Sequence, residues 1–246
     1  MDSFVMPLTI GHVEALYRYP VKSMAGESLH SANLGWHGIE GDRRLALRRL
    51  EDRGGGFPWL TAGKFPDLIR FTPERGGTSD LPTHIRTPDG QSLPIFSEEL
   101  AAEIARRYNS PVEMMHYKHG IFDEGTISLI ASDTICELSR LAGLNPDVRR
   151  FRPNILVKLL QPIPFQEDDW VGCILSFGES ADAPAVSVTL RDERCAMLNL
   201  DPDTAQPNPE MLKAVVHAHQ NTAGVYAAVT RTGKLAVGQP IILNRH

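Results

Sequence analysis

Apolar and polar positions alternate with a period of two in several short stretches of the chain. Residues 12–19 are the clearest, with Val13 and Ala15 on one predicted side and His12 and Glu14 on the other. Such alternation is typical of a β-strand, because successive side chains of a strand point to opposite faces. Further strands are predicted at residues 45–50, 67–72, 84–87, 92–95, 152–157, 186–190, 226–230 and 234–243.

Three other segments carry apolar side chains at helical spacing. The first is predicted to begin after Ser97, whose hydroxyl can cap it. The second begins near Thr134, which has capping-box spacing to Glu137, and it ends at Gly143. The third follows Asn208, a capping residue, with a proline in its first turn. The residues at helical spacing are Leu100, Ile104 and Tyr108, then Ile135, Leu138 and Leu141, then Leu212, Val215, Val216 and His219.

Strands outnumber helices in this pattern, which predicts a mainly β chain with some α, of the α+β class. With 246 residues, the chain suits one large domain or two small, tightly joined ones. Its composition shifts between residues 109 and 126, beside the turn Asn109-Ser110-Pro111. We therefore expect two abutting domains, at residues 1–118 and 119–246.

Composition and charge narrow the function classes. Hydrophobic residues make up 42% of the chain and charged residues 22%, which is an ordinary globular balance. The net charge of −5 argues against a broad nucleic-acid surface. No apolar run approaches the ~18 residues of a membrane span, and the first residues lack the pattern of a signal peptide. We expect a cytoplasmic monomer with neither a nucleic acid nor a membrane as partner.

Two segments resemble known ligand-binding motifs, but the spacing of their residues excludes both. The glycines at 54–56 and the pair Gly63-Lys64 make no phosphate-binding loop, because Phe65 stands where a magnesium-binding hydroxyl is needed. A glycine-rich surface turn is the better prediction for residues 54–56. Asp201-Pro202-Asp203 starts like a calcium loop but lacks its central glycine, and Leu212 stands where the closing glutamate is required.

The cysteines differ in their surroundings. Cys136, Cys173 and Cys195 form no C-x-x-C pair, and their odd number leaves at least one thiol free, which favours a reducing compartment. Cys136 and Cys173 have apolar neighbours and are expected to be buried. Cys195 instead follows Arg194, and a neighbouring cation favours the thiolate, the form that binds metals.

Cations beside turn residues recur at three distant places. Lys22, Arg43 and Arg152 each follow a strand-like run or sit in one next to a turn residue. If they converge in the fold, they form a pocket for a small anion such as a phosphate. Taken singly, each is explained as readily by a solvated surface position.

Together these clusters resemble a known family. The motifs, in chain order, are Tyr19-Pro20-Val21-Lys22-Ser23, Gly41-Asp42-Arg43-Arg44, Phe151-Arg152-Pro153-Asn154, Arg194-Cys195, Leu200-Asp201-Pro202-Asp203-Thr204, Gly224-Val225-Tyr226 and Val237-Gly238-Gln239-Pro240. Their order and identity resemble MOSC-domain proteins of the two-part kind, with the nearest likeness to the mitochondrial amidoxime-reducing component and its bacterial relatives. The likeness extends from about residue 10 to residue 243.

The resemblance implies a fold and a set of site residues. The fold is a MOSC-type β-barrel with a smaller N-terminal α/β part. The implied cofactor is a molybdenum cofactor of the molybdopterin type, with Cys195 as the metal ligand and catalytic residue. The implied cofactor-binding residues are Lys22, Ser23, Arg43, Arg152, Asn154, Arg194 and Tyr226, with Thr126 as a further candidate. The chain departs from the family at Thr61-Ala62-Gly63-Lys64, where a basic contact is displaced or lost.

The implied function is an oxidoreductase that reduces N-hydroxylated or N-oxide compounds. The substrate is a small molecule, and the electrons come from a separate donor protein because no redox domain is recognised in the sequence. Two alternatives stay open. In one, Cys195 carries sulfur as a persulfide or delivers the cofactor to an acceptor. In the other, the protein is a non-catalytic module that binds a small anion.

Overall fold

The computed structural model describes residues 8–51, 57–77, 80–121 and 124–244. The glycine-rich turn predicted at residues 54–56 lies outside these ranges. The predicted class is confirmed, because the chain is mostly strand with a smaller share of helix. No helix in the described ranges is long and apolar enough to cross a membrane.

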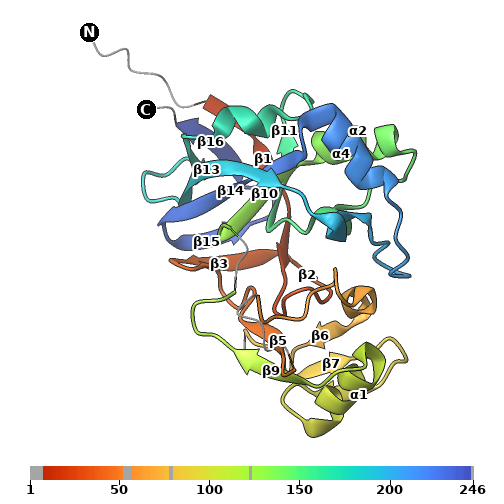
Figure 1. Cartoon of the computed structure of the whole chain (residues 1–246). Coiled ribbons are helices and arrows are strands. Elements are labelled where there is room, and N and C mark those ends of the chain that lie inside the picture. The colour runs from red at the N-terminus through yellow and green to blue at the C-terminus, as the bar shows by residue number, and fades with distance from the viewer. Residues whose placement is uncertain (1–7, 52–56, 78–79, 122–123, 245–246) are drawn as a thin grey trace.

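The larger region of the molecule is a closed barrel of seven strands. They are β1 (Leu8–Arg18), β10 (Ile127–Ala131), β11 (Ile155–Leu159), β12 (Ile174–Phe177), β13 (Ala185–Glu193), β14 (Thr222–Arg231) and β16 (Pro240–Asn244). Their order is β11-β10-β14-β13-β12-β16-β1, and β1 closes the barrel by pairing back with β11. The barrel occupies the upper part of the molecule in Figure 1.

Inward-facing side chains of these strands fill the barrel. Val13 and Leu16 of β1 are fully buried there with Leu129, Val157 and other aliphatic side chains. The register of β1 shifts between Val13 and Ala15, so a bulge interrupts the alternation. Ala15 therefore packs outside the barrel, against the helices, and the prediction that Val13 and Ala15 share one side is wrong.

Helices cover one side of the barrel, where α2 (Ser132–Ala142) and α4 (Glu210–His219) lie side by side (Figure 1). Their buried residues pack with Ile130 and Leu156 from the outer faces of β10 and β11. The short helix α3 (Val148–Phe151) precedes β11 and contributes Phe151 to the same cluster.

The smaller region has a core of its own below the barrel (Figure 1). Its elements are β5 (Leu45–Arg49), the 3-10 helix η1 (Pro66–Arg70), β6 (Thr72–Glu74), β7 (His84–Arg86), β8 (Ser92–Pro94), α1 (Glu98–Tyr108) and β9 (Val112–His116). β5 pairs with β9, and β6, β7 and β8 form a second small sheet. The core contains Leu47, Leu68 and Phe71 beside the buried face of α1.

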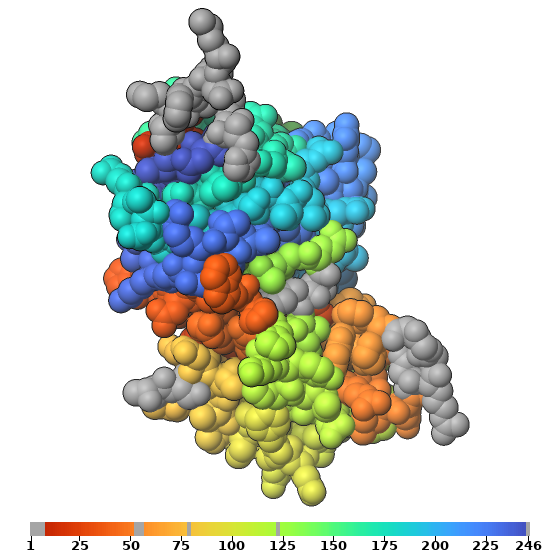
Figure 2. All heavy atoms as spheres, turned by 90° about the vertical axis from the view of Figure 1, so that its left-hand side faces the viewer, coloured from red at the N-terminus to blue at the C-terminus, as the bar shows by residue number. Residues whose placement is uncertain are grey.

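A third small sheet lies on the barrel's side that faces the smaller region. It pairs β3 (Ser31–Gly35) with β4 (Gly38–Ile39) and with β15 (Gly233–Ala236), and β2 (Glu27–Leu29) extends the barrel sheet from β1. Figure 2 shows these N-terminal segments between the blue C-terminal residues and the yellow-green smaller region. The division at residues 118 and 119 stays a prediction. In space, β1 and β3 of the first predicted segment pair with strands of the second.

Several local predictions hold. The Ser97 hydroxyl accepts a hydrogen bond of 3.2 Å from the backbone N–H of Leu100 and caps α1. α2 ends at Gly143, whose φ of +67° suits a glycine. The Asn208 side chain accepts a bond of 3.1 Å from the N–H of Glu210 at the start of α4.

Other local predictions are wrong. Residues 66–70 form the 3-10 helix η1 instead of a strand, and residues 234–243 form two strands that Gly238 separates with a positive φ. α2 begins at Ser132, ahead of the predicted start at Thr134, and Leu141 is exposed. On α4, Val216 is exposed as well.

Candidate functional site

The predicted site residues converge on one cavity of about 560 Å³. Those that line it are Lys22, Ser23, Arg43, Arg152, Arg194, Cys195 and Tyr226. They come from the segment after β1, the turn before β5, the end of α3, the segment after β13 and strand β14. The cavity thus gathers one thiol and several cations that lie far apart in the sequence.

Cys195 sits where the chain leaves β13. It caps the N-terminus of the 3-10 helix η3 (Ala196–Asn199), and its carbonyl accepts a bond of 3.1 Å from Leu198 N–H. Its side chain is exposed and lines the cavity. Cys173 is buried as predicted, but Cys136 is exposed on α2, so the prediction that Cys136 is buried is wrong.

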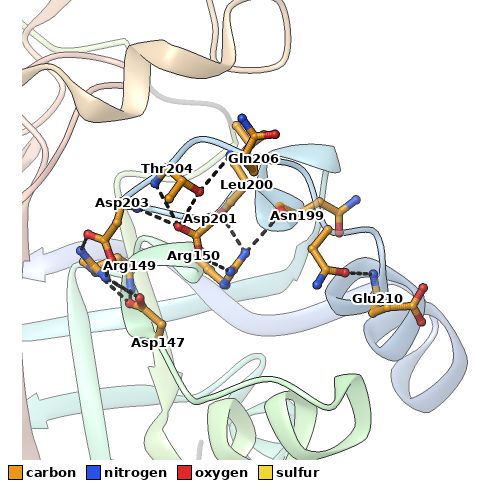
Figure 3. A network of polar contacts seen from close by, with 11 residues as sticks. Asp147, Arg149, Arg150, Asn199, Leu200, Asp201, Asp203, Thr204, Gln206 and Glu210 are labelled. Atoms are coloured by element: carbon orange, nitrogen blue, oxygen red, sulfur yellow. Dashed lines mark hydrogen bonds and ion pairs between the residues drawn. The ribbon is translucent and has the colours of Figure 1, made fainter. Parts of the chain in front are cut away.

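Two arginines of α3 fix the segment that follows Cys195 (Figure 3). Arg150, which is buried, donates to the carbonyl of Leu200 at 2.8 Å and to the carboxylate of Asp201 at 3.0 Å. Arg149 bridges Asp147 and Asp203. The Asp-Pro-Asp-Thr motif therefore anchors the segment after Cys195 to α3. Sequence reasoning missed both arginines because their partners in this motif lie about fifty residues away.

Asp201 also stabilises the turn that follows it. One carboxylate oxygen accepts bonds from the backbone N–H of Thr204 at 3.0 Å and from its hydroxyl at 2.9 Å (Figure 3). These hydrogen bonds hold the pKa of Asp201 below its usual value. A carboxylate that accepts several local donors is engaged by the protein itself, which agrees with the rejection of a calcium loop.

A buried carboxylate orients Arg43. Asp42 is fully buried, accepts a bond of 2.7 Å from Tyr19 N–H, and pairs with the Arg43 guanidinium. Its second oxygen also accepts from the Asn154 amide at 3.1 Å. Asn154, whose amide oxygen accepts from Ser128 N–H at 3.1 Å, is fully buried and does not line the cavity. The structure thus places Asn154 behind the cavity wall, in support of Asp42 and Arg43.

The Tyr19 ring packs against two of the cavity arginines. The guanidinium carbons of Arg43 and Arg152 lie 5.1 Å and 4.2 Å from its centroid, within cation–π range. Arg152 also donates to the carbonyl of Met24 at 2.7 Å, which ties the barrel to the core of the smaller region. Burial raises the pKa of Tyr19, so the ring stays neutral between these two cations.

Three residues of the cavity wall have a left-handed backbone. The φ angles are +66° at Ser23, +48° at Arg43 and +54° at Arg152. Residues other than glycine rarely adopt this region, and such conformations cluster at functional sites, where the surrounding structure holds them. No glycine marks these positions in the sequence, so pattern analysis gave no sign of them.

A second buried carboxylate holds Arg194. Asp192 is 2% exposed, pairs with the Arg194 guanidinium, and accepts a bond of 3.2 Å from the Ser128 hydroxyl. Burial raises the pKa of Asp192, whereas Arg194 and hydrogen bonds from Ser128 and Tyr226 act in the opposite direction. The positive charge of Arg194 is therefore largely neutralised by Asp192. Sequence reasoning missed Asp192 and Ser128, which line the same cavity.

Of the remaining candidates, some line the cavity and others do not. Lys22 is buried in the wall, with its ammonium 5.4 Å from the centre of the Phe57 ring. Thr61 and Gly63 line the cavity, but Lys64 does not. Within the described wall, residues 61–64 therefore supply no basic side chain. Thr126 donates to the Ala227 carbonyl at 3.3 Å and lies outside the lining.

The family follows from two sequence profiles. The profile described as the MOSC domain matches residues 116–242, and that of the MOSC N-terminal beta barrel domain matches residues 10–128. The chain belongs to the MOSC domain family. MOSC domains bind the molybdenum cofactor in general, and the resemblance inferred from the sequence motifs is confirmed at this level.

Among the similar solved structures, the YUAD protein shares the overall fold of this chain. The YUAD protein from Bacillus subtilis is 15% identical over 98% of both chains, with a TM-score of 0.54. The YiiM proteins from Geobacillus stearothermophilus and Escherichia coli are 20% and 15% identical, over 49% and 50% of this chain and 55% of theirs, with TM-scores of 0.38 and 0.36. A comparison with curated proteins found no match.

Proposed function

We propose that this MOSC protein is a molybdenum-cofactor-binding oxidoreductase that reduces N-hydroxylated or N-oxide compounds. The observation that carries the proposal is the meeting of the Cys195 thiol with Lys22, Arg43 and Arg152 in one cavity. On this proposal the protein is a cytoplasmic monomer that takes electrons from a separate donor protein.

The chemistry of the cavity wall suits such a cofactor. A thiolate is a soft ligand and favours a soft, redox-active metal. Planar guanidinium groups bind phosphate oxygens in pairs, and Lys22 adds a compact positive charge. A volume of about 560 Å³ lies within the range of small-molecule and cofactor sites. Cys195 would hold the metal, and the basic residues would hold the pterin and its phosphate.

When bound, the cofactor supplies two-electron chemistry at an oxygen atom, and the protein supplies binding and electrostatics. The overall reaction balances as R–NHOH + 2 e⁻ + 2 H⁺ → R–NH₂ + H₂O. Arg43 and Arg152 are held in place by Asp42, Met24 and the Tyr19 ring before any ligand arrives. Preorganised charges of this kind bind an anion without first having to reorganise.

The activity is tested by steady-state reduction of benzamidoxime with an artificial electron donor, after metal loading has been measured. Wild type and Cys136→Ala are expected to turn over at similar rates, because Cys136 lies on α2, outside the cavity lining. Cys195→Ala is expected to be inactive. A loaded wild-type protein without turnover would remove the reductase activity from the proposal.

The exposure of Cys195 supports a second candidate, a sulfur or cofactor carrier. An exposed thiol at a cavity mouth is accessible to a partner protein. As a carrier it would take one sulfur atom from a desulfurase persulfide, converting Cys195–SH to Cys195–SSH. Intact-mass measurement with a cysteine desulfurase separates the two: a gain of one sulfur on Cys195, reversed by a thiol reductant and without molybdenum, favours the carrier.

A further inference from the structure

A second cavity lies at the junction of the two regions, apart from the one that contains Cys195. Its volume is about 220 Å³. Its wall combines Arg18 at the end of β1 with Ser31 and Asn33 of β3 and Lys234 of β15. Arg75, Asp80 and Glu40 close it from the loops on the other side. β3 and β15 lie on the barrel's side that faces the smaller region (Figure 1).

Arg18 is the buried group of this cavity, with 3% of its surface exposed. Its Nε donates to Glu27 at 2.7 Å, and its Nη1 donates to the Glu40 carbonyl at 2.8 Å and to Asp80 at 3.1 Å. Its Nη2 is buried and has no hydrogen-bond partner in the described part of the chain. Buried donors are almost always paired, and an unpaired donor on a charged group is especially unfavourable.

The local chain is built to bring Arg18 to this place. Gly41 has a φ of +81°, and a side chain there would meet Arg18 Nη1 at 2.9 Å and the Asp80 carbonyl at 2.5 Å. Only glycine allows so close an approach in that conformation. The close approach of Arg18 to this turn therefore requires a glycine at position 41.

The acidic residues near the cavity are already matched by arginines. Glu27 pairs with both Arg18 and Arg75, at 2.7 Å and 3.3 Å. Asp80 contacts the same two arginines, at 3.1 Å and 3.9 Å. Glu40, the third carboxylate, lies 4.0 Å from Arg44.

The positive groups are in excess. Lys234, which is exposed and lines the cavity, makes no ion pair within the described residues. Ser31 and Asn33, on the same side of the cavity, add a hydroxyl and an amide that can donate hydrogen bonds. The cavity therefore presents one unmatched ammonium and two neutral donors, with the Arg18 guanidinium in its wall.

We propose that this junction cavity is a binding site for a small oxyanion, such as phosphate, sulfate or a carboxylate. The anion binds to Lys234 and to the Arg18 guanidinium, and the side chains of Ser31 and Asn33 complete its hydrogen bonds. The site is separate from the cavity that contains Cys195 and does not depend on the proposed reaction.

The test is isothermal titration of the full chain with inorganic phosphate, in wild type and four variants. Lys234→Gln and Arg18→Lys change the junction cavity, and the exposed position of Lys234 keeps that variant folded. Lys22→Gln changes the cavity that contains Cys195, which also has cations in its wall. Lys213→Gln makes the same change in net charge on the exposed face of α4.

Saturable phosphate binding is expected in the wild type. It should weaken about tenfold or more in Lys234→Gln and Arg18→Lys, the size expected for losing a charged hydrogen bond. Lys213→Gln should leave it unchanged. Lys22→Gln should affect only a separate phosphate-binding event at the cavity that contains Cys195 and should keep the one that Lys234→Gln weakens. Competition by sulfate assigns the site to tetrahedral oxyanions, and competition by acetate alone assigns it to carboxylates. Absence of saturable binding, or a loss seen only in Lys22→Gln or equally in Lys213→Gln, would overturn the proposal.

Discussion

At the scale of single residues, the cavity that contains Cys195 depends on buried carboxylates that fix arginines. Asp42 holds Arg43, and Asp192 holds Arg194. Asp42 stood in a quoted motif but received no role, and Asp192 was not recognised, because an aspartate near an arginine is also an ordinary surface pattern. The basic residues and Cys195 could be named from motifs, but the acids that position them become visible only when distant segments meet.

Replacement of Asp42 tests how strongly the site depends on this pairing. Asp42→Ala removes the buried carboxylate that pairs with the Arg43 guanidinium and accepts a hydrogen bond from the Asn154 amide. We expect the free energy of unfolding to fall by about 3 kcal/mol, the loss typical of breaking a buried ion pair. Urea unfolding followed by tryptophan fluorescence measures this loss.

The matched control for Asp42 is Asp182→Ala, since Asp182 is an exposed aspartate in a turn. It should change the free energy of unfolding by less than about 0.5 kcal/mol. If Asp42→Ala were as mild as this control, the buried pair of Asp42 and Arg43 would not stabilise the fold.

At the scale of elements, the sequence pattern predicted a helix start correctly where the capping residue lies in the same segment. Ser97 caps α1 from within its own segment, so its role could be read directly. α2 has no such local cap. Instead Glu167 of the 3-10 helix η2 (Gln166–Trp170) accepts bonds from Ala131 N–H at 3.4 Å and from the Thr134 hydroxyl at 2.9 Å. Thr134 was therefore misread as a cap, because its true partner lies 33 residues further along.

Glu167 makes stability depend on pH. Burial raises the pKa of Glu167 from its usual 4.5 to about 7, and the hydrogen bonds from its own N–H, Thr134 and Ala131 only partly oppose this. The folded state then binds the proton more tightly than the unfolded chain. Stability from this group is present in full below pH 4.5 and is lost as the pH rises to about 7.

Glu167→Gln should remove this dependence, because glutamine keeps the hydrogen-bond acceptor without the charge. Between pH 5 and pH 8, we expect the wild type to lose about 2 kcal/mol more unfolding free energy than the variant. Urea unfolding at both pH values measures the difference. Glu137→Gln, a substitution on α2, should behave like the wild type. Equal slopes for wild type and Glu167→Gln would contradict the account.

At the scale of the whole molecule, the barrel is closed by its first strand. β1 pairs with β11 on one side and β16 on the other, and it carries Val13 and Leu16 into the core. The strand-rich class and the family followed from sequence, and the β1 strand itself was predicted. Its place in the barrel could not be, because periodicity gives the faces of a strand but not its neighbours, and the bulge after Val13 changed even the faces.

The position of β1 predicts that residues 119–246 do not fold alone. Without β1, the barrel has two open edges and loses the buried side chains of that strand. A proton–nitrogen NMR spectrum of this segment is expected to show poor dispersion, and co-expression with residues 1–118 should restore the native spectrum. A well-dispersed spectrum of residues 119–246 by itself would show that β1 is dispensable.

The central claim concerns Cys195 and the cations around it, and it is tested most directly by metal and pterin content. Wild type, Cys195→Ala and Cys136→Ala would be purified from a host that makes the molybdenum cofactor, then analysed for molybdenum by mass spectrometry and for pterin by fluorescence. We expect equal amounts of molybdenum and pterin in the wild type and in Cys136→Ala, and a loss of most molybdenum in Cys195→Ala. A wild type free of both, or a Cys195→Ala protein loaded as fully as the wild type, would contradict the assignment of Cys195 as the metal ligand.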